Sequence, residues 1–268
     1  MKTLKDGKKL VETILKTNGF NWTGERPLIA VLRNSKQKDD TGFNYVIDDS
    51  MNCCDTVLLI GKTGNDAVSL EGRSFPHKKW QAKQAAHTAN ANYIASGFYP
   101  MAWRKGFHFS YRALVQHVKF MIWRSEDLEI RDGDDYAQYN IVADNFHGWA
   151  PDSAGCVTVE GSMQREDGDW GAAVKWIYDA NRSETFFDAA ILNNSDIRDR
   201  DEKLRFGSGG EDVKKMQKLL SRIYGVRADG DFGPVTHYTL IKFQRENGLE
   251  PDGIYGPKTR EALEKKGQ

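Results

Sequence analysis

The chain has 268 residues, of which 39% are hydrophobic and 11% aromatic, so it can bury a core that a disordered chain could not build. Lys and Arg total 38 and so do Asp and Glu, which leaves a formal net charge of zero and gives no reason to expect nucleic acid or an anionic membrane as partner. No run of about 18 apolar residues exists, so we expect no membrane-spanning helix.

The N-terminus begins with lysines, as a secretory signal does, but charged residues interrupt every apolar run of the required length. Leu10, Val11 and Ile14 lie instead at helical spacing, which predicts a short amphipathic helix. We therefore expect the protein to be made in the cytoplasm of a bacterial host without a signal peptide.

The next elements are predicted from runs of β-branched and aliphatic residues and from their spacing. Strands are expected at 27–34, 44–49, 55–61, 118–124, 136–149 and 185–192, and helices at 79–96 and 170–182. Strands outnumber helices, so the pattern predicts a β-rich α+β domain.

The three cysteines are Cys53, Cys54 and Cys156. Their odd number and the adjacent pair make a disulfide framework unexpected, and no CxxC spacing indicates a cysteine-rich zinc site. We expect Cys53 and Cys54 to pack in the fold, and we expect neither cofactor nor metal.

The segment 197–212 is polar and charged and then rich in glycine, and it separates two regions with different sequence patterns. We predict a first domain at 1–195, a linker at 196–203 and a second domain at 204–268. The second domain contains a repeat, because DGDFGPVTHYTL (229–240) returns as DGIYGPKTREAL (252–263). Each Asp-Gly pair predicts a tight turn and each aromatic residue should pack inward, while Thr236 and Thr259 should cap the helices that follow. Three short helices joined by two such turns are expected.

This second domain resembles the peptidoglycan-binding domain 1 family. The resemblance rests on LRFGSGGEDVKKMQKLL (204–220), DGDFG (229–233), FQRENGL (243–249) and DGIYG (252–256). It implies that the domain binds bacterial peptidoglycan. In this family the Asp-Gly turns line a shallow groove, so the resemblance makes Asp229, Phe232, Asp252 and Tyr255 candidate contacts.

In the first domain, Cys156 follows the small residues of SAGC (153–156), and His147 ends the expected strand 136–149. A cysteine nucleophile needs a neighbouring base, which is usually imidazole. Strand alternation places Asn145 on the same face as His147, where it could orient the ring, and the backbone N–H groups at 155 and 156 could stabilise an oxyanion. The alternative is that Cys156 is a small buried apolar residue and His147 a satisfied polar one.

The motif NFHGW (145–149) followed by SAGC is similar to the active-site strip of L,D-transpeptidase-type (YkuD-like) cysteine enzymes. The segments SGFYP (96–100), GFHFSYRALVQ (106–116) and MIWRSED (121–127) extend the resemblance. It implies that Cys156 is the nucleophile and His147 the base, with Ser153 and Gly155 matching the conserved box of that family. Ala154 departs from the family, which has a second histidine there, so altered chemistry or an inactive domain remains open.

Other polar residues could line a cleft. The side chains of His108, Arg112, Gln116 and Arg124 could hold carboxylates of a stem peptide, and Trp149 could form a wall; ordinary surface polarity is the alternative. A zinc site of His108, His117 and His147 lacks a supporting motif. Three other histidines are expected at the surface: His77, His87 and His237. Acidic residues suited to glycan cleavage are also present: Glu160, Glu166, Asp132, Asp134 and Asp135.

The sequence thus predicts a monomeric, endolysin-like murein hydrolase that acts at the cell wall and attacks an amide in the peptide part of peptidoglycan through a Cys/His thioacyl mechanism. Two main alternatives stay open: a peptidoglycan-binding protein with an inactive L,D-transpeptidase-like domain, and a metal-dependent murein peptidase. A glycan-cleaving enzyme is a third.

Overall fold

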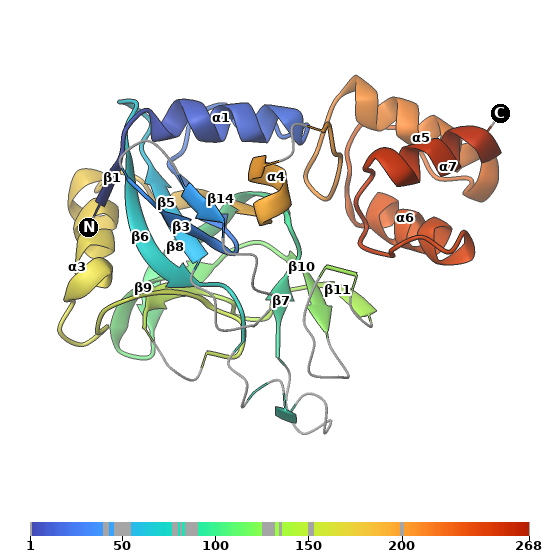
Figure 1. Ribbon diagram of the computed structural model, residues 1–268. Helices are drawn as coiled ribbons and strands as arrows, with labels where there is room; N and C mark the ends of the chain where they lie inside the picture. The colour runs from blue at the N-terminus through green and yellow to red at the C-terminus, as the bar shows by residue number, and fades with distance from the viewer. Residues whose placement is uncertain are drawn as a thin grey trace.

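The computed structural model describes residues 2–39, 43–45, 55–76, 80, 82–83, 91–124, 132–133, 136–149, 153–198 and 201–267. Figure 1 shows a β-rich unit formed by the N-terminal part of the chain and, beside it, a small helical module formed by the C-terminal part. The predicted α+β class is therefore confirmed. In the described residues, no helix is long and apolar enough to cross a bilayer.

Strands supply most of the N-terminal unit. In chain order they are β1 (Lys2–Leu4), β2 (Leu28–Leu32), β3 (Ser35–Gln37), β4 (Phe43–Tyr45), β5 (Asp55–Ile60), β6 (Ala67–Arg73), β7 (Tyr93–Ile94), β8 (Gly97–His108), β9 (Tyr111–Gln116), β10 (Phe120–Arg124), β11 (Tyr136–Asn140), β12 (Phe146–Gly148), β13 (Val157–Val159) and β14 (Phe186–Leu192). Three helical elements accompany them: α1 (Gly7–Thr17), α3 (Gly168–Val174), which runs on into the π-helix η1 (Lys175–Ala180), and α4 (Asn194–Arg198).

The main sheet closes on itself. Its strand order is β1-β6-β13-β12-β9-β8-β14-β2-β5, and β5 also pairs with β6. The eight strands from β6 round to β5 thus form a barrel, with β1 as an additional strand along β6. Most neighbouring strands are antiparallel, but β12 and β13 are parallel, as are β2 and β14.

The two faces of the barrel wall are both buried where a helix covers the outside. Residues Ile29 and Val31 of β2 belong to the interior cluster, whereas their neighbours Leu28 and Ala30 belong to a second cluster with Val11 of α1. Alternation along the strand therefore sends side chains to two separate cores, which explains why β2 reads as a continuous apolar run. The predicted N-terminal helix is confirmed as α1.

Two predicted elements are wrong in part. The expected strand 136–149 is two strands, β11 and β12, because the chain breaks at 141–145 and Ala143 adopts a left-handed φ of 60°. The expected helix 79–96 ends as strand β7, which pairs with β10, and residues 84–90 lie outside the described part of the chain. The remaining part of the predicted strand 44–49 beyond Tyr45 also lies outside it.

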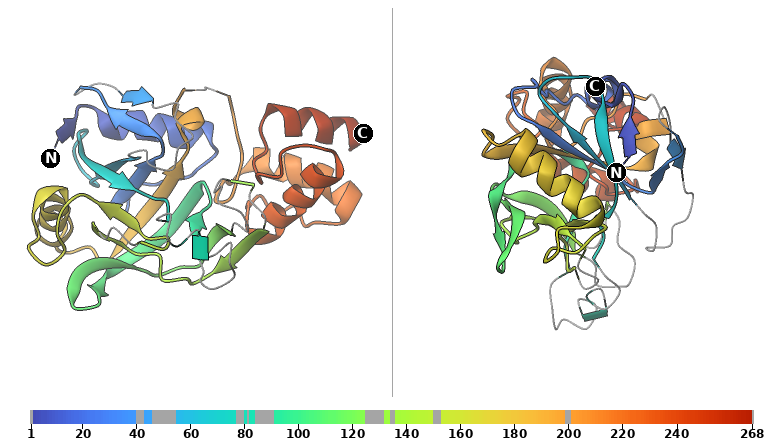
Figure 2. Two further views of the ribbon diagram at one scale, coloured as in Figure 1. Left: turned by 60° about the horizontal axis from the view of Figure 1, so that its bottom comes forward. Right: turned by 90° about the vertical axis from the view of Figure 1, so that its left-hand side faces the viewer.

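The C-terminal module consists of α5 (Glu211–Tyr224), α6 (Pro234–Glu246) and α7 (Pro257–Lys266), packed around one apolar cluster (Figure 2). In all, the described residues contain six α-helices and one π-helix, and three of the six form this module. The glycines of the two Asp-Gly turns have positive φ, 89° at Gly230 and 69° at Gly253, as such tight turns require. The predicted threonine caps are wrong: glycines occupy both N-cap positions, and proline begins each helix.

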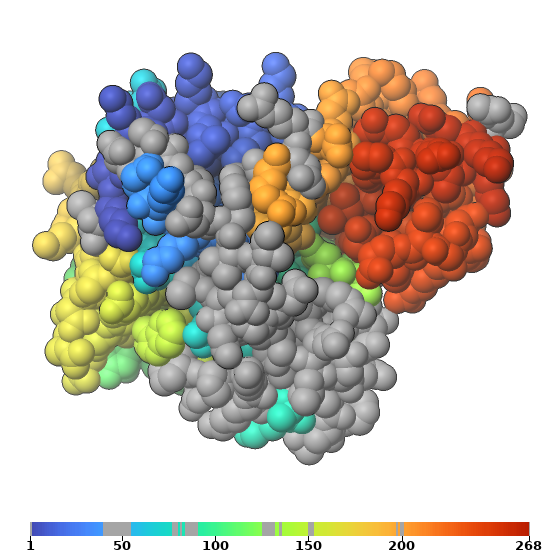
Figure 3. All heavy atoms as spheres, viewed as in Figure 1, coloured from blue at the N-terminus to red at the C-terminus, as the bar shows by residue number. Residues whose placement is uncertain are grey.

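The segment after α4 ties the two units together. The buried Arg205 guanidinium donates to both carboxylate oxygens of Asp196, at 2.8 and 2.6 Å, and to Ser96 Oγ at 2.9 Å. The Phe206 ring joins the interior cluster of the N-terminal unit, and its carbonyl accepts from the Phe98 amide. In Figure 3 the atoms of α4 and of this segment lie between the two units. The division at residue 204 stays a prediction.

Candidate functional site

The candidate base, His147, lies in β12, and the candidate nucleophile, Cys156, directly precedes the neighbouring strand β13. Strands β12 and β13 pair in parallel with Phe146 opposite Val157, and the Val157 amide donates to the Asn145 carbonyl at 2.9 Å. Phe146 and Val157 point into the interior cluster. Alternation therefore turns Asn145, His147 and Cys156 to the other face of the wall.

The His147 ring has a defined orientation. Its Nδ1 lies 2.6 Å from the Gly148 carbonyl oxygen, and since a carbonyl can only accept, Nδ1 carries the proton. Nε2 is then left as the acceptor. Only 1% of the residue is exposed, and burial lowers the pKa of His147 to about 4, so the ring is neutral at pH 7 and able to take a proton.

A second histidine, His108 at the end of β8, stacks on this ring. The two ring centroids are 4.6 Å apart and the planes differ by 9°. The Asn145 amide Nδ2 lies 2.9 Å from His108 Nδ1, while its Oδ1 accepts from the Gln116 amide at 2.9 Å. Asn145 thus orients His108, whereas the sequence predicted that it would orient His147.

The Cys156 thiol is half-buried. Its sulfur accepts from the Asn145 amide at 3.4 Å and donates to the Ala143 carbonyl at 3.6 Å. Burial first, and the nearby Asp144 carboxylate second, raise the pKa of the Cys156 thiol to about 12. The sulfur is therefore a thiol at neutral pH, and among the hydrogen bonds of the described residues none joins it to His147.

The loop before Cys156 is built around a close contact at Gly155. A Cβ there would lie 2.5 Å from Asp144 Oδ1 and 2.5 Å from the Asn92 side chain, so only glycine fits. Ser153 Oγ donates to the Cys156 carbonyl at 3.1 Å and accepts from the Gly155 amide at 3.3 Å. The Gly155 amide is consequently engaged within the loop, whereas the sequence predicted it as an oxyanion donor.

Beneath this loop lies Asp144, which the sequence reasoning missed. Its Oδ1 accepts from the side-chain Nδ2 of Asn92 at 2.8 Å, and the backbone N–H of Asn92 donates to the Ala154 carbonyl at 2.7 Å. Oδ2 is buried and has no hydrogen-bond partner among the described residues. Burial raises the pKa of Asp144 to about 7, against the opposing effect of the Arg124 cation. Nothing in the local sequence distinguishes this aspartate from a strand or loop residue.

The residues predicted to hold carboxylates have partners within the protein. Arg112 forms an ion pair with Glu166. Gln116 Oε1 accepts from the amides of Val142 and Asp144, which holds the break before β12 in place. Arg124 is buried and donates to the Ala91 carbonyl. Gln116 and Arg124 therefore have partners within the fold, and the role of the four residues as carboxylate ligands stays a prediction.

Two exposed aromatic side chains, Phe109 and Trp149, follow the two histidines of the site in the chain. Phe109, at the tip of the β8–β9 hairpin, is 84% exposed, and its ring lies 4.5 Å from the His108 ring. Trp149 follows β12 and is partly exposed, with the Arg73 guanidinium 4.7 Å from its ring centroid. The role of Trp149 as a wall of the site stays a prediction, and Phe109 was not among the residues predicted from the sequence.

The candidate residues of the C-terminal module serve its own fold. Gln217 Nε2 donates to Asp229 Oδ1 at 2.9 Å and its Oε1 accepts from the amide that follows; Gln244 repeats this with Asp252 at 2.7 Å. Phe232 and Tyr255 pack inward, as predicted, and are 1% and 5% exposed. The two rings are largely buried, although Tyr255 also lines a cavity of about 270 Å³, and Asp229 remains exposed. The role of these four residues as ligand contacts stays a prediction.

The three histidines of the proposed zinc site do not lie together: His108 stacks on His147, but His117 is elsewhere. His108 and His117 lie at opposite ends of the β8–β9 pair, and the His117 ring packs on Phe186 at 4.6 Å. Within the described ranges, no group of three His, Cys, Asp or Glu side chains is placed to hold a metal ion. His237, predicted at the surface, is buried between Trp123 and Phe206, so that prediction is wrong. His77, His87, Cys53 and Cys54 lie outside the described residues.

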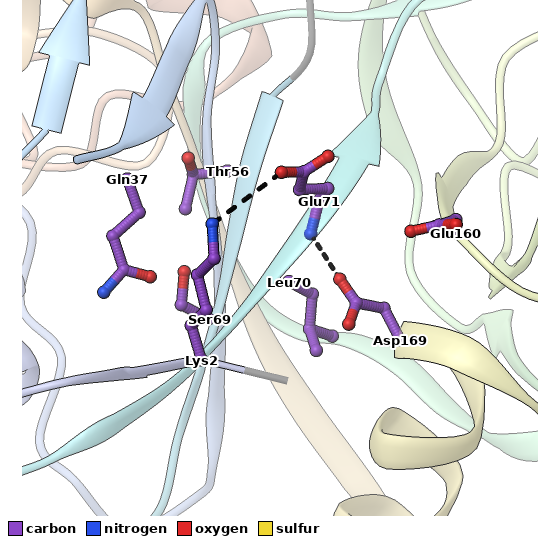
Figure 4. Close-up of a pocket in the computed structure, with 8 residues that line it drawn as sticks. All are labelled: Lys2, Gln37, Thr56, Ser69, Leu70, Glu71, Glu160 and Asp169. Atoms are coloured by element: carbon purple, nitrogen blue, oxygen red, sulfur yellow. Dashed lines mark hydrogen bonds and ion pairs between the residues drawn. The ribbon is translucent and has the colours of Figure 1, made fainter. Parts of the chain in front are cut away.

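The acidic residues of the glycan-cleaving alternative are dispersed. Asp132 accepts from the Ser96 amide and from Trp123 Nε1, each at 3.0 Å. Glu160 lines a separate cavity of about 190 Å³ (Figure 4), in which Asp169 accepts from the Glu71 amide at 2.7 Å. Asp134 and Asp135 lie outside the described residues. Of the candidate acids that the structure describes, Asp132, Glu160 and Glu166 do not form a carboxylate pair at the cysteine site.

Comparison with known proteins identifies the C-terminal module. Residues 209–263 match the family described as "Putative peptidoglycan binding domain". The chain is similar to a spore cortex-lytic enzyme of Halalkalibacterium halodurans, at 37% identity over 24% of this chain and 20% of that protein. It is also similar to the N-acetylmuramoyl-L-alanine amidase CwlM of Mycobacterium tuberculosis (45% identity, 20% of this chain, 14% of that protein) and to the zinc D-Ala-D-Ala carboxypeptidase of Streptomyces albus G (42%, 20% and 22%).

These likenesses are short. The chain spans less than a quarter of the length of each of these three relatives. The three relatives have different names, and the stretch that each of them shares with this chain is only about as long as the C-terminal module. The comparison therefore concerns that module and not a whole enzyme. No solved structure matches the chain significantly.

Proposed function

We propose that this protein is a cell-wall hydrolase that binds peptidoglycan through its C-terminal module and cleaves an amide bond in the peptide part of murein with its barrel unit. The module carries a peptidoglycan-binding domain, and the relatives that match are named as cell-wall enzymes. A module that holds the polymer raises the local concentration of substrate for a linked active site. The protein would therefore act at the cell wall.

The reaction type is supported by the position of Cys156, which directly precedes β13 and accepts from the Asn145 amide beside the paired strand β12 that carries His147, and by the His147 Nδ1 proton donated to the Gly148 carbonyl. In the proposed reaction, His147 Nε2 takes the thiol proton as the sulfur adds to the substrate carbonyl. The same imidazolium then donates that proton to the leaving amine, and the C–N bond breaks to leave a thioester. Water, with His147 again as base, hydrolyses the thioester and restores the thiol.

The raised pKa of Cys156 and the lowered pKa of His147 fit a resting pair of neutral thiol and neutral imidazole. Proton transfer then has to accompany sulfur attack, and both pKa shifts oppose it, because the thiol is a weaker acid and the imidazole a weaker base than usual. This requires the S–H bond to turn from the Ala143 carbonyl toward the imidazole when substrate binds.

A second candidate function is a peptidoglycan-binding protein whose barrel is inactive. It is favoured by the hydrogen bond of the thiol to a backbone carbonyl in place of the imidazole, and by Ala154, which departs from the histidine of the L,D-transpeptidase-type box.

Digestion of purified murein sacculi, with mass spectrometry of the released fragments, separates the two candidates. Cys156→Ala and His147→Ala should bind sacculi but release fragments at least about 100-fold more slowly than the wild type, given the usual contribution of a general base. His117→Ala, a histidine outside the site, is the matched control and should digest normally. Equal digestion by wild type and Cys156→Ala would remove the thiol mechanism, whereas binding without digestion by the wild type would establish the inactive-barrel alternative.

A further inference from the structure

A cavity of about 420 Å³ lies at the seam between the two units, apart from the cysteine site. Tyr136 of β11 forms one side, and Tyr238, Ile241 and the end of α6 form the other. Figure 1 shows β11 and α6 side by side at this seam. Neither unit alone contains the cavity.

The inner surface of the cavity is aromatic and aliphatic. Tyr238 remains 41% exposed there, Tyr136 is half-buried, and the buried Ile241 joins the interior cluster of the N-terminal unit. Tyrosine combines an apolar ring face with a polar hydroxyl. Such a surface suits a pyranose ring, which has an apolar face of C–H bonds and a polar rim of hydroxyls.

The rim of the cavity is charged. Lys242, Arg245 and Glu246 lie in the last turns of α6 and line it. The Lys242 ammonium lies 5.0 Å from the centroid of the Tyr224 ring and 3.9 Å from the Glu246 carboxylate. Among the described side chains that line the rim, two are cationic and one is anionic, which favours a ligand with a carboxylate. The peptide part of peptidoglycan supplies such a group beside its sugars.

The seam is held in a fixed geometry. The Tyr139 ring of β11 packs against Phe206 at 5.6 Å, and Phe206 in turn meets His237 of α6 edge-on at 6.2 Å. The Arg205–Asp196 pair anchors the same segment. A pre-formed cavity loses little freedom when a ligand binds, which favours affinity.

We propose that this cavity binds a saccharide–peptide unit of peptidoglycan, with Tyr136 and Tyr238 against the sugar and the cationic end of α6 toward a peptide carboxylate. It rests on the proposed function only in taking peptidoglycan as the ligand, and it does not depend on the cysteine chemistry. The turn residues that the sequence suggested for this role, Asp229 and Asp252, are occupied by Gln217 and Gln244. The seam therefore becomes the better-placed surface.

The test measures binding of a soluble disaccharide–tetrapeptide by calorimetry and of whole sacculi by co-sedimentation, in the full chain carrying Cys156→Ala so that the ligand is not consumed. Tyr238→Ala and Tyr136→Ala should each weaken binding about tenfold, as truncation of a central aromatic contact does. Tyr136 is decisive, because it lies outside the matched residues 209–263. Lys242→Glu should weaken binding about threefold or more at low salt, and less at high salt.

Val235 of α6 and Ile141 are exposed apolar residues outside the cavity, so Val235→Ala and Ile141→Ala are matched controls for the tyrosine variants. Lys218 is exposed, so Lys218→Glu is the control for Lys242→Glu. Normal binding by Tyr136→Ala and Lys242→Glu, with unchanged melting curves, would overturn this inference and leave peptidoglycan binding by the chain intact. Failure of the parent chain itself to bind sacculi would instead remove the proposed function.

Discussion

The C-terminal module and the barrel unit place their polar side chains in opposite ways. In the module, Gln217 and Gln244 each reach the Asp-Gly turn that follows in the chain and bond its carboxylate, its glycine amide and the threonine of the next helix. In the barrel, the candidate site joins His108 to Asn145 and Asn145 to Cys156, residues brought by separate strands.

This difference explains why the C-terminal module could be recognised from its sequence and the barrel unit could not. The Asp, Gly and Thr that each glutamine bonds recur at one spacing, as residues 229, 230 and 236 and again as residues 252, 253 and 259, and this local spacing is visible in the sequence. The glutamines themselves precede their aspartates by 12 and 8 residues, so they are not part of the repeated spacing. A contact between distant strands constrains no local spacing, because barrel closure alone brings the partners together.

The largest expected effect concerns the tie between the two regions. Among the described residues, Arg205→Ala leaves the buried Asp196 carboxylate with the more distant Lys203 ammonium, at 3.5 Å, as its cationic partner. Removal of one partner of a buried ion pair costs about 3–5 kcal/mol. Urea unfolding followed by tryptophan fluorescence should show a loss of this size, and the exposed Arg227→Ala should show almost none. A loss below about 1 kcal/mol would mean that the module and barrel are not coupled through this pair.

A middle effect tests whether the module is stabilised by its repeated glutamines. Gln244→Ala leaves the Gly253 amide and the Asp252 carboxylate without their side-chain partner, which should lower the free energy of unfolding by about 2–3 kcal/mol. Gln217→Ala should cost a similar amount, because its contacts are equivalent. Thermal melts of both variants beside Lys218→Ala provide the measurement, and a cost confined to one glutamine would contradict the equivalence of the two repeats.

The smallest effect concerns a contact that the barrel alone creates. The Asp144 carboxylate raises the pKa of the Cys156 thiol, so Asp144→Asn should lower that pKa and speed alkylation by iodoacetamide, by about tenfold for each unit of pKa. Because burial raises the pKa of Asp144 itself to about 7, the carboxyl is neutral below that pH. The difference between wild type and variant should therefore appear as pH rises through 7 and vanish below it.

The side-chain oxygen of the Asp144→Asn variant can still accept the hydrogen bond from Asn92 Nδ2, so the loop before Cys156 should retain its shape. Asp231→Asn, at an exposed aspartate of the C-terminal module, provides a matched control in which alkylation should not change. Equal alkylation rates for wild type and Asp144→Asn at pH 8 would show that Asp144 does not control the thiol.

The sequence by itself determined the helical module, the two Asp-Gly turns, the inward packing of Phe232 and Tyr255, and the β-rich class of the rest. Each of these follows from periodicity or turn chemistry over a few neighbouring residues, which is information that a single sequence carries.

Only the tertiary structure decided which polar groups meet. In the structure, the expected strand 136–149 is interrupted at Ala143, and Asn145 bonds His108 where a bond to His147 was expected. His237 and Asp144 are buried. The tertiary structure also creates the seam between Tyr136 and Tyr238. The physical reason is that burial and pairing across a closed barrel depend on the register of strands far apart in the chain, and no local spacing of residues specifies that register.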